Sequence, residues 1–255
     1  REAYRVAIHT FHSFGVEIIN RYPEYFYNGA SFLPADDITQ TEILEKIFSN
    51  LDYDNPLRSE HNGQFTYLRK AKKAIEYLKK AGLTPAEFKT VLVENKKAIN
   101  YINPIISSIF NERISKKMFP LIFKALEEIN RHQYAPLPGS FKPFAKTLTD
   151  SLADAINCAQ DQDSTGPLTA WKKKWTAKNN DKITQLTDAR DIEKMEALAD
   201  VYESYAAQMR EEGYYDYNDM ILDTIAMLEK NVGVRLDLEE QYQYILVDEF
   251  QDTND

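Results

Sequence analysis

The sequence predicts a mainly α-helical protein in which a long helical segment is inserted into a partial α/β domain formed by the two ends of the chain. Glycine is scarce, with 8 residues in 255, whereas Lys, Glu, Ala and Leu are plentiful, and this balance favours helices. Apolar residues recur at helical spacing through most of the middle. Strand-like runs stand only near the two ends, and two such strands are stable only if they share one sheet.

The N-terminal end is expected to contain a strand and a helix. Residues 5–10 form a short run with β-branched side chains at alternate positions, which predicts a strand. Residues 11–22 follow with apolar side chains at helical spacing, and Pro23 ends that helix.

Local signals mark where several helices of the middle begin and end. Residues 84–87, Thr-Pro-Ala-Glu, form a capping box with proline at the first helical position, and Gly82 closes the helix before it. Thr39 with Glu42 predicts another helix start. The clearest break is 136–140, Pro-Leu-Pro-Gly-Ser, whose serine is expected to cap the next helix.

The last third of the chain contains the strongest helical pattern. Residues 188–212 carry one apolar stripe, which indicates ordinary core packing, and Gly213 ends this helix. Asp216 with Asp219 then caps a helix that runs to about residue 229.

The chain closes with a second strand-like run. Residues 242–247, Tyr-Gln-Tyr-Ile-Leu-Val, are densely apolar and aromatic, follow a loop, and end in two acids. A parallel strand that is buried on both faces needs such side chains, so a buried parallel strand is predicted here.

Charge is segregated along the chain, although the net charge is only −9. Residues 1–55 carry −5, residues 56–150 carry +9, and residues 151–255 carry −13. A basic middle between acidic flanks indicates a surface that faces a polyanion. The alternative is that its lysines simply form solvated helix faces. The lysines concerned are Lys70, Lys72, Lys73, Lys79, Lys80, Lys96 and Lys97.

Other features narrow the class of protein. No apolar run approaches 18 residues, so no membrane-spanning helix is predicted. The first residues show no charged-then-apolar leader, and the lone Cys158 cannot form an internal disulfide. A reducing, cytoplasmic environment is the simplest expectation.

Two adjacent acids, Asp248 and Glu249, follow the predicted C-terminal strand. Ligands of open parallel sheets gather beyond the carboxyl ends of strands. At such a place the first acid could hold a hydrated magnesium ion beside phosphates, and the second could orient or deprotonate the attacking water. Acids at strand ends are also common without any catalytic role, so this pair alone leaves a structural role open.

Longer motifs are more specific than the acid pair. Residues 245–254, Ile-Leu-Val-Asp-Glu-Phe-Gln-Asp-Thr-Asn, resemble motif II of the UvrD/Rep/PcrA family of superfamily-one DNA helicases. Residues 10–14, Thr-Phe-His-Ser-Phe, resemble the TFHSF segment of that family, motif Ib. Residues 213–221 are similar to its G-x-x-D-F-x-D-L-L stretch, with Tyr in place of Phe and Met-Ile in place of Leu-Leu. Three matches in the family's order are more specific than any one of them.

The resemblance implies a domain layout. Residues 1–22 and 206–255 would belong to the RecA-like P-loop domain 1A, and residues 23–205 to the helical domain 1B that is inserted in it. In this family single-stranded DNA crosses domain 1A, and domain 1B lies over it near the duplex. The expected partners are therefore DNA, single-stranded or at a duplex junction, and the remaining helicase domains 1A, 2A and 2B of the parent chain, with no membrane.

The resemblance also assigns site residues. Asp248 would hold the magnesium ion together with Glu249, which would be the catalytic base. The predicted DNA-binding residues are Thr10, Phe11, His12, Ser13, Lys70, Lys73, Lys96 and Lys97. In the first four, the threonine and histidine would lie near the DNA backbone, and the phenylalanine and serine would shape the turn. The four lysines come from the basic middle, which would face the polyanion if it lies in domain 1B.

The phosphate-binding loop of such an enzyme is missing from the sequence, which contains no G-x-x-x-x-G-K-[ST] pattern. In this family the loop lies upstream of the TFHSF segment, so it would precede Arg1, and the arginines and the partner RecA-like domain would lie beyond Asp255. ATP and Mg²⁺ are thus expected as cofactors of the intact parent, an ATP-dependent DNA helicase. This chain alone is expected to bind neither tightly and to hydrolyse no ATP. Its terminal segments are expected to pack irregularly or to need partners for order.

Two other functions remain open. The chain could be a helical protein–protein interaction module that inherited the flanking motifs, or part of a helicase–nuclease of the RecB or AddA type. Salt-dependent DNA binding separates the first alternative from the helicase hypothesis. A nuclease would lie far downstream, so the sequence leaves the second alternative open.

Overall fold

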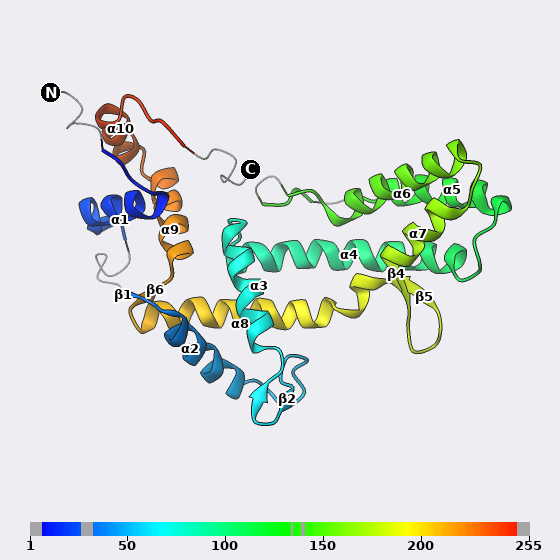
Figure 1. Cartoon of the computed structure of the whole chain (residues 1–255), viewed down its shortest axis with the longest axis horizontal. Helices are drawn as coiled ribbons and strands as arrows, with labels where there is room; N and C mark the ends of the chain where they lie inside the picture. Colours follow the sequence, from blue (N-terminus) through cyan, green and yellow to red (C-terminus); the bar gives the residue numbers. More distant parts are fainter. Residues whose placement is uncertain (1–6, 27–32, 134, 139–140, 249–255) are drawn as a thin grey trace. The chain divides into compact units, whose positions relative to one another are not determined.

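The computed structural model describes residues 7–26, 33–133, 135–138 and 141–248. Most of these residues are helical, and the strands among them are only two or three residues long (Figure 1). The prediction of a mainly α protein is therefore confirmed.

The chain divides into two compact units. The first unit combines Arg1–Thr84 with Val201–Asp255, and the second unit is Pro85–Asp200. The boundary between Asp200 and Val201 falls inside helix α8 (Ile192–Glu211), so this helix contributes to both units.

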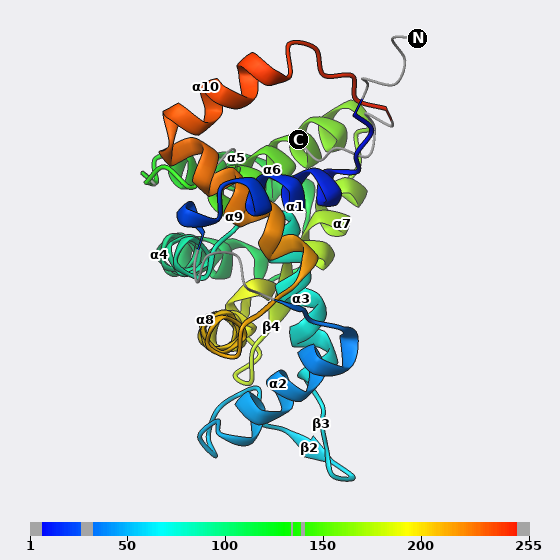
Figure 2. The ribbon, with the colours of Figure 1, turned by 90° about the vertical axis from the view of Figure 1, so that its left-hand side faces the viewer.

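The first unit contains five full helices in its described part. Its elements are α1 (Phe11–Arg21), η2 (Pro23–Tyr25), β1 (Leu33–Pro34), α2 (Asp37–Ser49), β2 (Glu60–His61), β3 (Gln64–Phe65), α3 (Leu68–Lys80), the last part of α8, β6 (Tyr214–Tyr215), α9 (Tyr217–Lys230) and α10 (Val232–Gln241). Helix α9 packs against α1, α10 and α3 (Figure 2). A small apolar core lies between α1, α9 and α10, and it consists of Ile18, Met227, Val234 and Leu238.

Helix α3 is amphipathic and buries one stripe of side chains. Leu68, Ala71, Ile75 and Lys79 are the buried residues of this helix, at the three- and four-residue spacing of one helical face. The stripe faces α2 and α9, and its Lys79 also lies beside Tyr205 of α8. The opposite face is rich in basic side chains and lies in solvent.

A short parallel bridge joins two distant parts of the first unit. Strand β1 pairs with β6 so that Leu33 stands opposite Tyr214. The backbone N–H of Leu33 donates to the carbonyl oxygen of Gly213 at 2.9 Å, and that of Ala35 donates to the carbonyl oxygen of Tyr215 at 2.8 Å. The bridge brings the chain just before α2 next to the chain just before α9.

The second unit is a helical bundle with one β-hairpin. Its elements are α4 (Pro85–Phe110), η4 (Lys116–Met118), α5 (Phe119–Asn130), α6 (Phe144–Asp161), α7 (Gly166–Trp175), β4 (Thr176–Lys178), β5 (Thr184–Leu186), η5 (Thr187–Arg190) and the first part of α8. Helices α4, α5, α6 and α7 pack together, and β5 lies along α4. Among the core side chains without solvent exposure are Ile102, Ile106, Phe110, Ile122, Leu148 and Leu152.

Several predicted helix ends are confirmed. Gly82 and Gly213 follow α3 and α8 with φ angles of 74° and 75°, a left-handed conformation that glycine adopts without the steric cost of a Cβ. Helix α4 begins at Pro85. Asp216 caps α9, and its side chain accepts hydrogen bonds from the N–H groups of Asn218 and Asp219.

Two other predicted helix starts are wrong. Helix α2 begins at Asp37, because the Asp36 carboxylate accepts the Thr39 N–H at 2.8 Å and thereby caps the helix three residues earlier than expected. Helix α6 begins at Phe144 with Pro143 at the cap position, rather than after Ser140, which lies outside the described residues.

Neither strand predicted near the chain ends is present in the described residues. Residues 7–10, the described part of the 5–10 run, and residues 242–247 form no strand. The side chain of Leu246 is 97% exposed instead of buried. A strand exists only through hydrogen bonds to a neighbouring strand, and no described segment pairs with either run.

None of the helices described by the structure has both the length and the apolar character that crossing a membrane requires.

Candidate nucleic-acid interface and acid pair

The N-terminus of α1 presents four of the predicted DNA-binding residues. The Thr10 side chain accepts the Ser13 N–H at 3.1 Å, and the Ser13 Oγ accepts the Thr10 N–H at 2.8 Å. This reciprocal capping box satisfies two backbone donors and explains why the helix starts at Phe11. All four residues, 10–13, are exposed, so their outer atoms are open to a ligand.

His12 is oriented by a second helix. Its imidazole lies edge-on against the ring of Tyr217, with 5.4 Å between the ring centroids and 85° between the planes. Tyr217 is the first residue of α9 and is 60% exposed. The contact places the TFHSF segment next to the Gly213–Ile221 segment, the third motif of the sequence.

Lys70 and Lys73 lie on the exposed face of α3, and each ammonium sits near an aromatic ring. Lys70 Nζ is 5.7 Å from the ring centroid of Tyr67, and Lys73 Nζ is 5.6 Å from that of Tyr77. Tyr77 itself is 58% exposed. Neither lysine forms an ion pair with a carboxylate in the part of the chain that the structure describes. Basic groups interleaved with exposed aromatic rings can bind phosphates and stack on bases.

Lys96 and Lys97, on α4 in the second unit, are already paired with acids. Lys96 Nζ lies 2.7 Å from a carboxylate oxygen of Glu196, and Lys97 Nζ lies 2.6 Å from one of Glu94. The ammonium of Lys97 and the backbone N–H of Ala135 hold the pKa of Glu94 below its usual value. These two lysines thus have less unbalanced charge to offer a polyanion than the two on α3.

Lys79 is a residue that sequence reasoning missed. The charge pattern of the sequence places it among the lysines of a DNA-facing or solvated surface, but it is only 2% exposed, so both interpretations are wrong for it. Its ammonium lies between the carboxylates of Asp216 and Asp219. The signal was present in the sequence, because Lys79 follows Leu68 and Ile75 on the buried stripe of α3.

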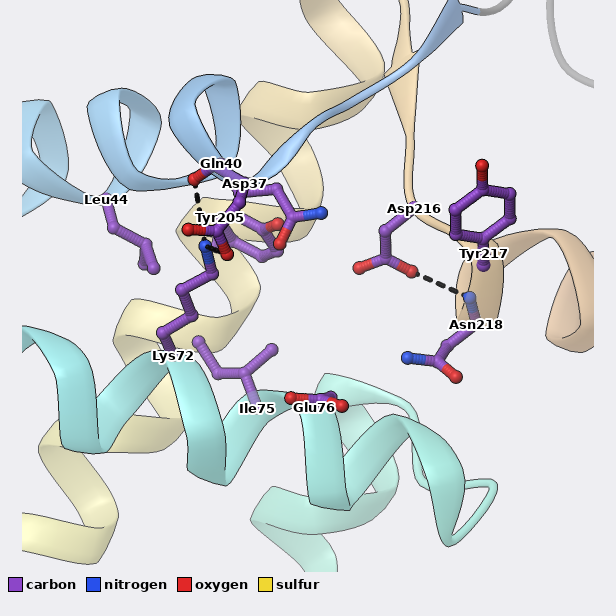
Figure 3. Close-up of a pocket in the computed structure, with 10 residues that line it drawn as sticks. All are labelled: Asp37, Gln40, Leu44, Lys72, Ile75, Glu76, Tyr205, Asp216, Tyr217 and Asn218. Atoms are coloured by element: carbon purple, nitrogen blue, oxygen red, sulfur yellow. Dashed lines mark hydrogen bonds and ion pairs between the residues drawn. The ribbon is translucent and has the colours of Figure 1, made fainter.

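A small cavity lies beside these residues within the first unit. Its volume is about 230 Å³, and it is lined by residues of α2, α3, the last part of α8 and the start of α9 (Figure 3). Its lining residues are Asp37, Gln40, Leu44, Lys72, Ile75, Glu76, Tyr205, Asp216, Tyr217 and Asn218. Lys72 Nζ pairs with the Asp37 carboxylate at 2.6 Å, and Glu76 pairs with Lys80 at 2.7 Å. The lining charges are therefore largely compensated within the protein.

The C-terminal acid pair is only partly within the described residues. The Tyr242 hydroxyl donates to a Glu17 carboxylate oxygen at 3.0 Å, and the chain then continues without regular structure to Asp248, which is exposed. Glu249, the predicted catalytic base, lies outside the described residues. In the described part no group of three or more His, Cys, Asp or Glu side chains could hold a metal ion.

The sequence matches a family of helicase domains. All 255 residues match the family model of the UvrD/REP helicase N-terminal domain, so the chain belongs to this family, as the motifs predicted. It is 27% identical to the ATP-dependent DNA helicase PcrA of Leuconostoc citreum over 169 residues, which are 62% of this chain and 22% of that protein.

Shorter matches extend to other relatives. The chain is 35% identical to the exonuclease/helicase subunit RexA of Lactococcus lactis subsp. cremoris over 66 residues, 26% of this chain and 5% of that protein. It is 34% identical to the ATP-dependent DNA helicase UvrD1 of Mycobacterium bovis over 58 residues, 23% of this chain and 8% of that protein. The matched segments thus correspond to less than a quarter of the length of each of these curated relatives.

Proposed function

We propose that this chain is part of an ATP-dependent DNA helicase or translocase, to which it contributes a DNA-contacting surface and the acid pair of the ATP site. The observation that carries the proposal is the match of the whole chain to the UvrD/REP helicase N-terminal domain. In this proposal residues 1–22 and 206–255 belong to domain 1A and residues 23–205 to domain 1B. The DNA would be single-stranded or at a duplex junction.

The proposed DNA surface combines the start of α1 with the outer face of α3. At α1 the exposed Thr10 and His12 approach the backbone, while Ser13 holds the helix start in place. At α3 the ammonium groups of Lys70 and Lys73 contact phosphates, and releasing the counterions of those phosphates favours binding. Phe11 is largely exposed at the same helix start and offers a ring for stacking on a base. Lys96 and Lys97 are secondary candidates, because Glu196 and Glu94 already balance their charges.

The salt dependence of single-strand binding tests this surface. The double variant Lys70→Glu/Lys73→Glu should weaken binding and lower the slope of log K against log salt by about 1.4, the value for two phosphate contacts on a single strand. Fluorescence anisotropy of a labelled oligonucleotide at several salt concentrations measures the slope.

The matched control is Lys96→Glu/Lys97→Glu, which changes the net charge by the same amount. Its slope should fall by less than half as much, because those lysines already neutralise carboxylates. Equal slopes for both variants would remove α3 as the main contact. A wild-type chain with no salt-dependent DNA binding would favour the protein–protein interaction module instead.

For the ATP site, we propose that Asp248 holds the magnesium ion and Glu249 orients the attacking water in the intact parent protein. Mg²⁺ and ATP would supply the electrostatics and the phosphoryl group of the reaction. The chain alone is proposed to be inactive, because it contains no phosphate-binding loop sequence.

Two ATPase measurements test these roles. The purified chain with Mg²⁺ and ATP should show no turnover above its Glu249→Gln variant, and turnover above that level would contradict the proposed inactivity. In the parent protein Glu249→Gln should lower kcat by roughly 100-fold or more, the range for loss of a general base. A parent enzyme that keeps its kcat would remove Glu249 from the catalytic role.

The match to RexA favours a second candidate function. That relative is described as an exonuclease/helicase subunit, so the parent of this chain could belong to a helicase–nuclease of the AddA type. The parent protein, incubated with linear duplex DNA, ATP and Mg²⁺, would then release nucleotides as well as unwound strands. Unwinding without any nucleotide release would reject this candidate and leave the helicase proposal intact.

A further inference from the structure

The start of α9 is fixed to α3 by a single buried cation. Lys79 Nζ lies 2.7 Å from an oxygen of Asp216 and 2.6 Å from an oxygen of Asp219. The same ammonium stands 5.0 Å from the ring centroid of Tyr205, a side chain of α8 that is itself 2% exposed. All of these residues belong to the first unit.

In each of the two carboxylates, one oxygen accepts backbone N–H groups of the helix cap and the other pairs with Lys79. In Asp216, Oδ1 accepts the N–H groups of Asn218 and Asp219 at 3.0 and 2.9 Å, and Oδ2 accepts the Lys79 ammonium. In Asp219, Oδ2 accepts the Asp216 N–H at 3.2 Å, and Oδ1 faces Lys79. The helix cap and the ion pairs therefore share the same two side chains, so the ammonium holds the first turn of α9 in position relative to α3.

Tyr217 lies between these two acids in the sequence, and its side chain faces α1. The Tyr217 ring makes the edge-on contact with His12. On the other side, Lys79 lies six residues after Lys73 on the same helix, so its position is rigidly tied to the basic face of α3. The ion network thus connects the two surfaces of the proposed DNA interface, α1 at His12 and α3 at Lys73.

We propose that Lys79 is a positioning residue, which sets the place of His12 relative to the basic face of α3 through Asp216, Asp219 and Tyr217, and does not itself touch the nucleic acid. That the distance between His12 and the basic face of α3 matters for DNA binding rests on the proposed function. That Lys79 positions His12 rests only on the contacts among Lys79, the two acids and Tyr217.

A neutral version of the network tests the proposal without unfolding the protein. Lys79→Met alone leaves two largely buried carboxylates without their cation and can unfold the chain. The triple variant Lys79→Met/Asp216→Asn/Asp219→Asn removes all three charges together, and asparagine at position 216 still caps a helix well. Circular dichroism should show unchanged helix content for this variant.

Two matched controls accompany it. Lys80→Met removes the next positive charge along the helix, whose ammonium pairs with Glu76 at the surface. Tyr217→Leu removes the ring beside His12 and gives the spectrum of a histidine that has lost this contact.

The first readout needs no DNA. In ¹H–¹³C NMR spectra, the His12 ring signals of the triple variant should move towards those of Tyr217→Leu and lose their nuclear Overhauser contacts to the Tyr217 ring, whereas Lys80→Met should leave both unchanged. A folded triple variant with wild-type His12 signals would overturn the proposal.

The second readout separates positioning from phosphate contact. The triple variant should bind a single-stranded oligonucleotide about tenfold more weakly than wild type. Its slope of log K against log salt should not change, because Lys70 and Lys73 keep their contacts with phosphates and no charged contact is lost. A lower slope would show that Lys79 binds phosphate directly and would overturn the proposal. If the wild-type chain binds no DNA, the proposed function fails, and the NMR readout still decides whether Lys79 positions His12.

Discussion

Helices α3 and α4 both carry lysines of the basic middle segment, but these lysines make different contacts on the two helices. On α3, Lys79 is buried between two acids, whereas Lys70 and Lys73 lie in solvent beside tyrosine rings. On α4, Lys96 and Lys97 form surface ion pairs with acids of the same unit. A sum of charges along the sequence therefore does not show which lysines support the fold and which remain available to a ligand.

The largest difference between the two helices is expected in stability. Lys79→Met should lower the free energy of unfolding by roughly 3–5 kcal/mol, because it leaves a largely buried carboxylate pair uncompensated. Lys96→Met should change it by only about 0–1 kcal/mol, because its ion pair with Glu196 is exposed to water. Urea denaturation followed by circular dichroism measures both values. Similar losses for the two variants would contradict the distinction between the helices.

A smaller difference in the free energy of unfolding is expected when one exposed tyrosine on each helix is replaced by alanine. Tyr101 of α4 donates from its hydroxyl to the carbonyl oxygen of Glu128 at 3.2 Å, and its ring stacks on His132 at 4.9 Å. Tyr101→Ala should therefore lower the free energy of unfolding by about 1–2 kcal/mol. Tyr77→Ala should change it by less than about 0.5 kcal/mol.

The same pair of variants should differ in the opposite sense for DNA. Tyr77→Ala should weaken single-strand binding by about 1 kcal/mol through lost stacking on a base, and Tyr101→Ala should leave it unchanged. Anisotropy titrations at one salt concentration test this, and an unaltered affinity for Tyr77→Ala would limit the α3 contact to its lysines.

The smallest expected effect is a difference in pH dependence. Burial, and the neighbouring Asp216 carboxylate that shares one ammonium with it, raise the pKa of Asp219. The stability that this raised pKa contributes is present below the ordinary pKa of 3.8 and is lost as the pH rises through the folded-state pKa. The pKa of Glu94 is lowered, so its contribution is present above the ordinary value of 4.5 and is lost as the pH falls through the folded-state pKa.

The measurement compares Asp219→Asn and Glu94→Gln with wild type from about pH 3 to about pH 7. With rising pH, the stability of wild type relative to Asp219→Asn should fall, and that relative to Glu94→Gln should rise. Profiles with the same sign would show that the two acids occupy equivalent environments.

Signals that act within one helix turn were predictable from the sequence. Gly82, Gly213 and Asp216 were identified correctly because a left-handed glycine or a capping carboxylate acts on its nearest neighbours. The Glu94–Lys97 pair is also local, three residues apart on one helix. By contrast, the partner of Lys96 lies 100 residues away at Glu196, and nothing in a local pattern reveals it.

The strands were not predictable in the same way. Residues 242–247 have the apolar composition of a buried strand, but a strand also needs a neighbour for its backbone hydrogen bonds, which composition does not provide. The predicted site residues likewise include some that depend on local patterns and some that depend on tertiary packing. The mutual capping of Thr10 and Ser13 is a local pattern, whereas the contact of His12 with Tyr217 depends on the packing of α1 against α9.

The bridge between β1 and β6 has a consequence for how this family can vary. Ala35 and Gly213 both take part in the backbone hydrogen bonds of this bridge. The two ends of the segment between them therefore lie next to each other. The entropy of closing such an excursion grows slowly, by about 0.6 kcal/mol for each doubling of its length. The intervening segment can therefore change in length beyond α3 without stretching the residues at its two ends, whereas α3 itself is held to α9 by Lys79.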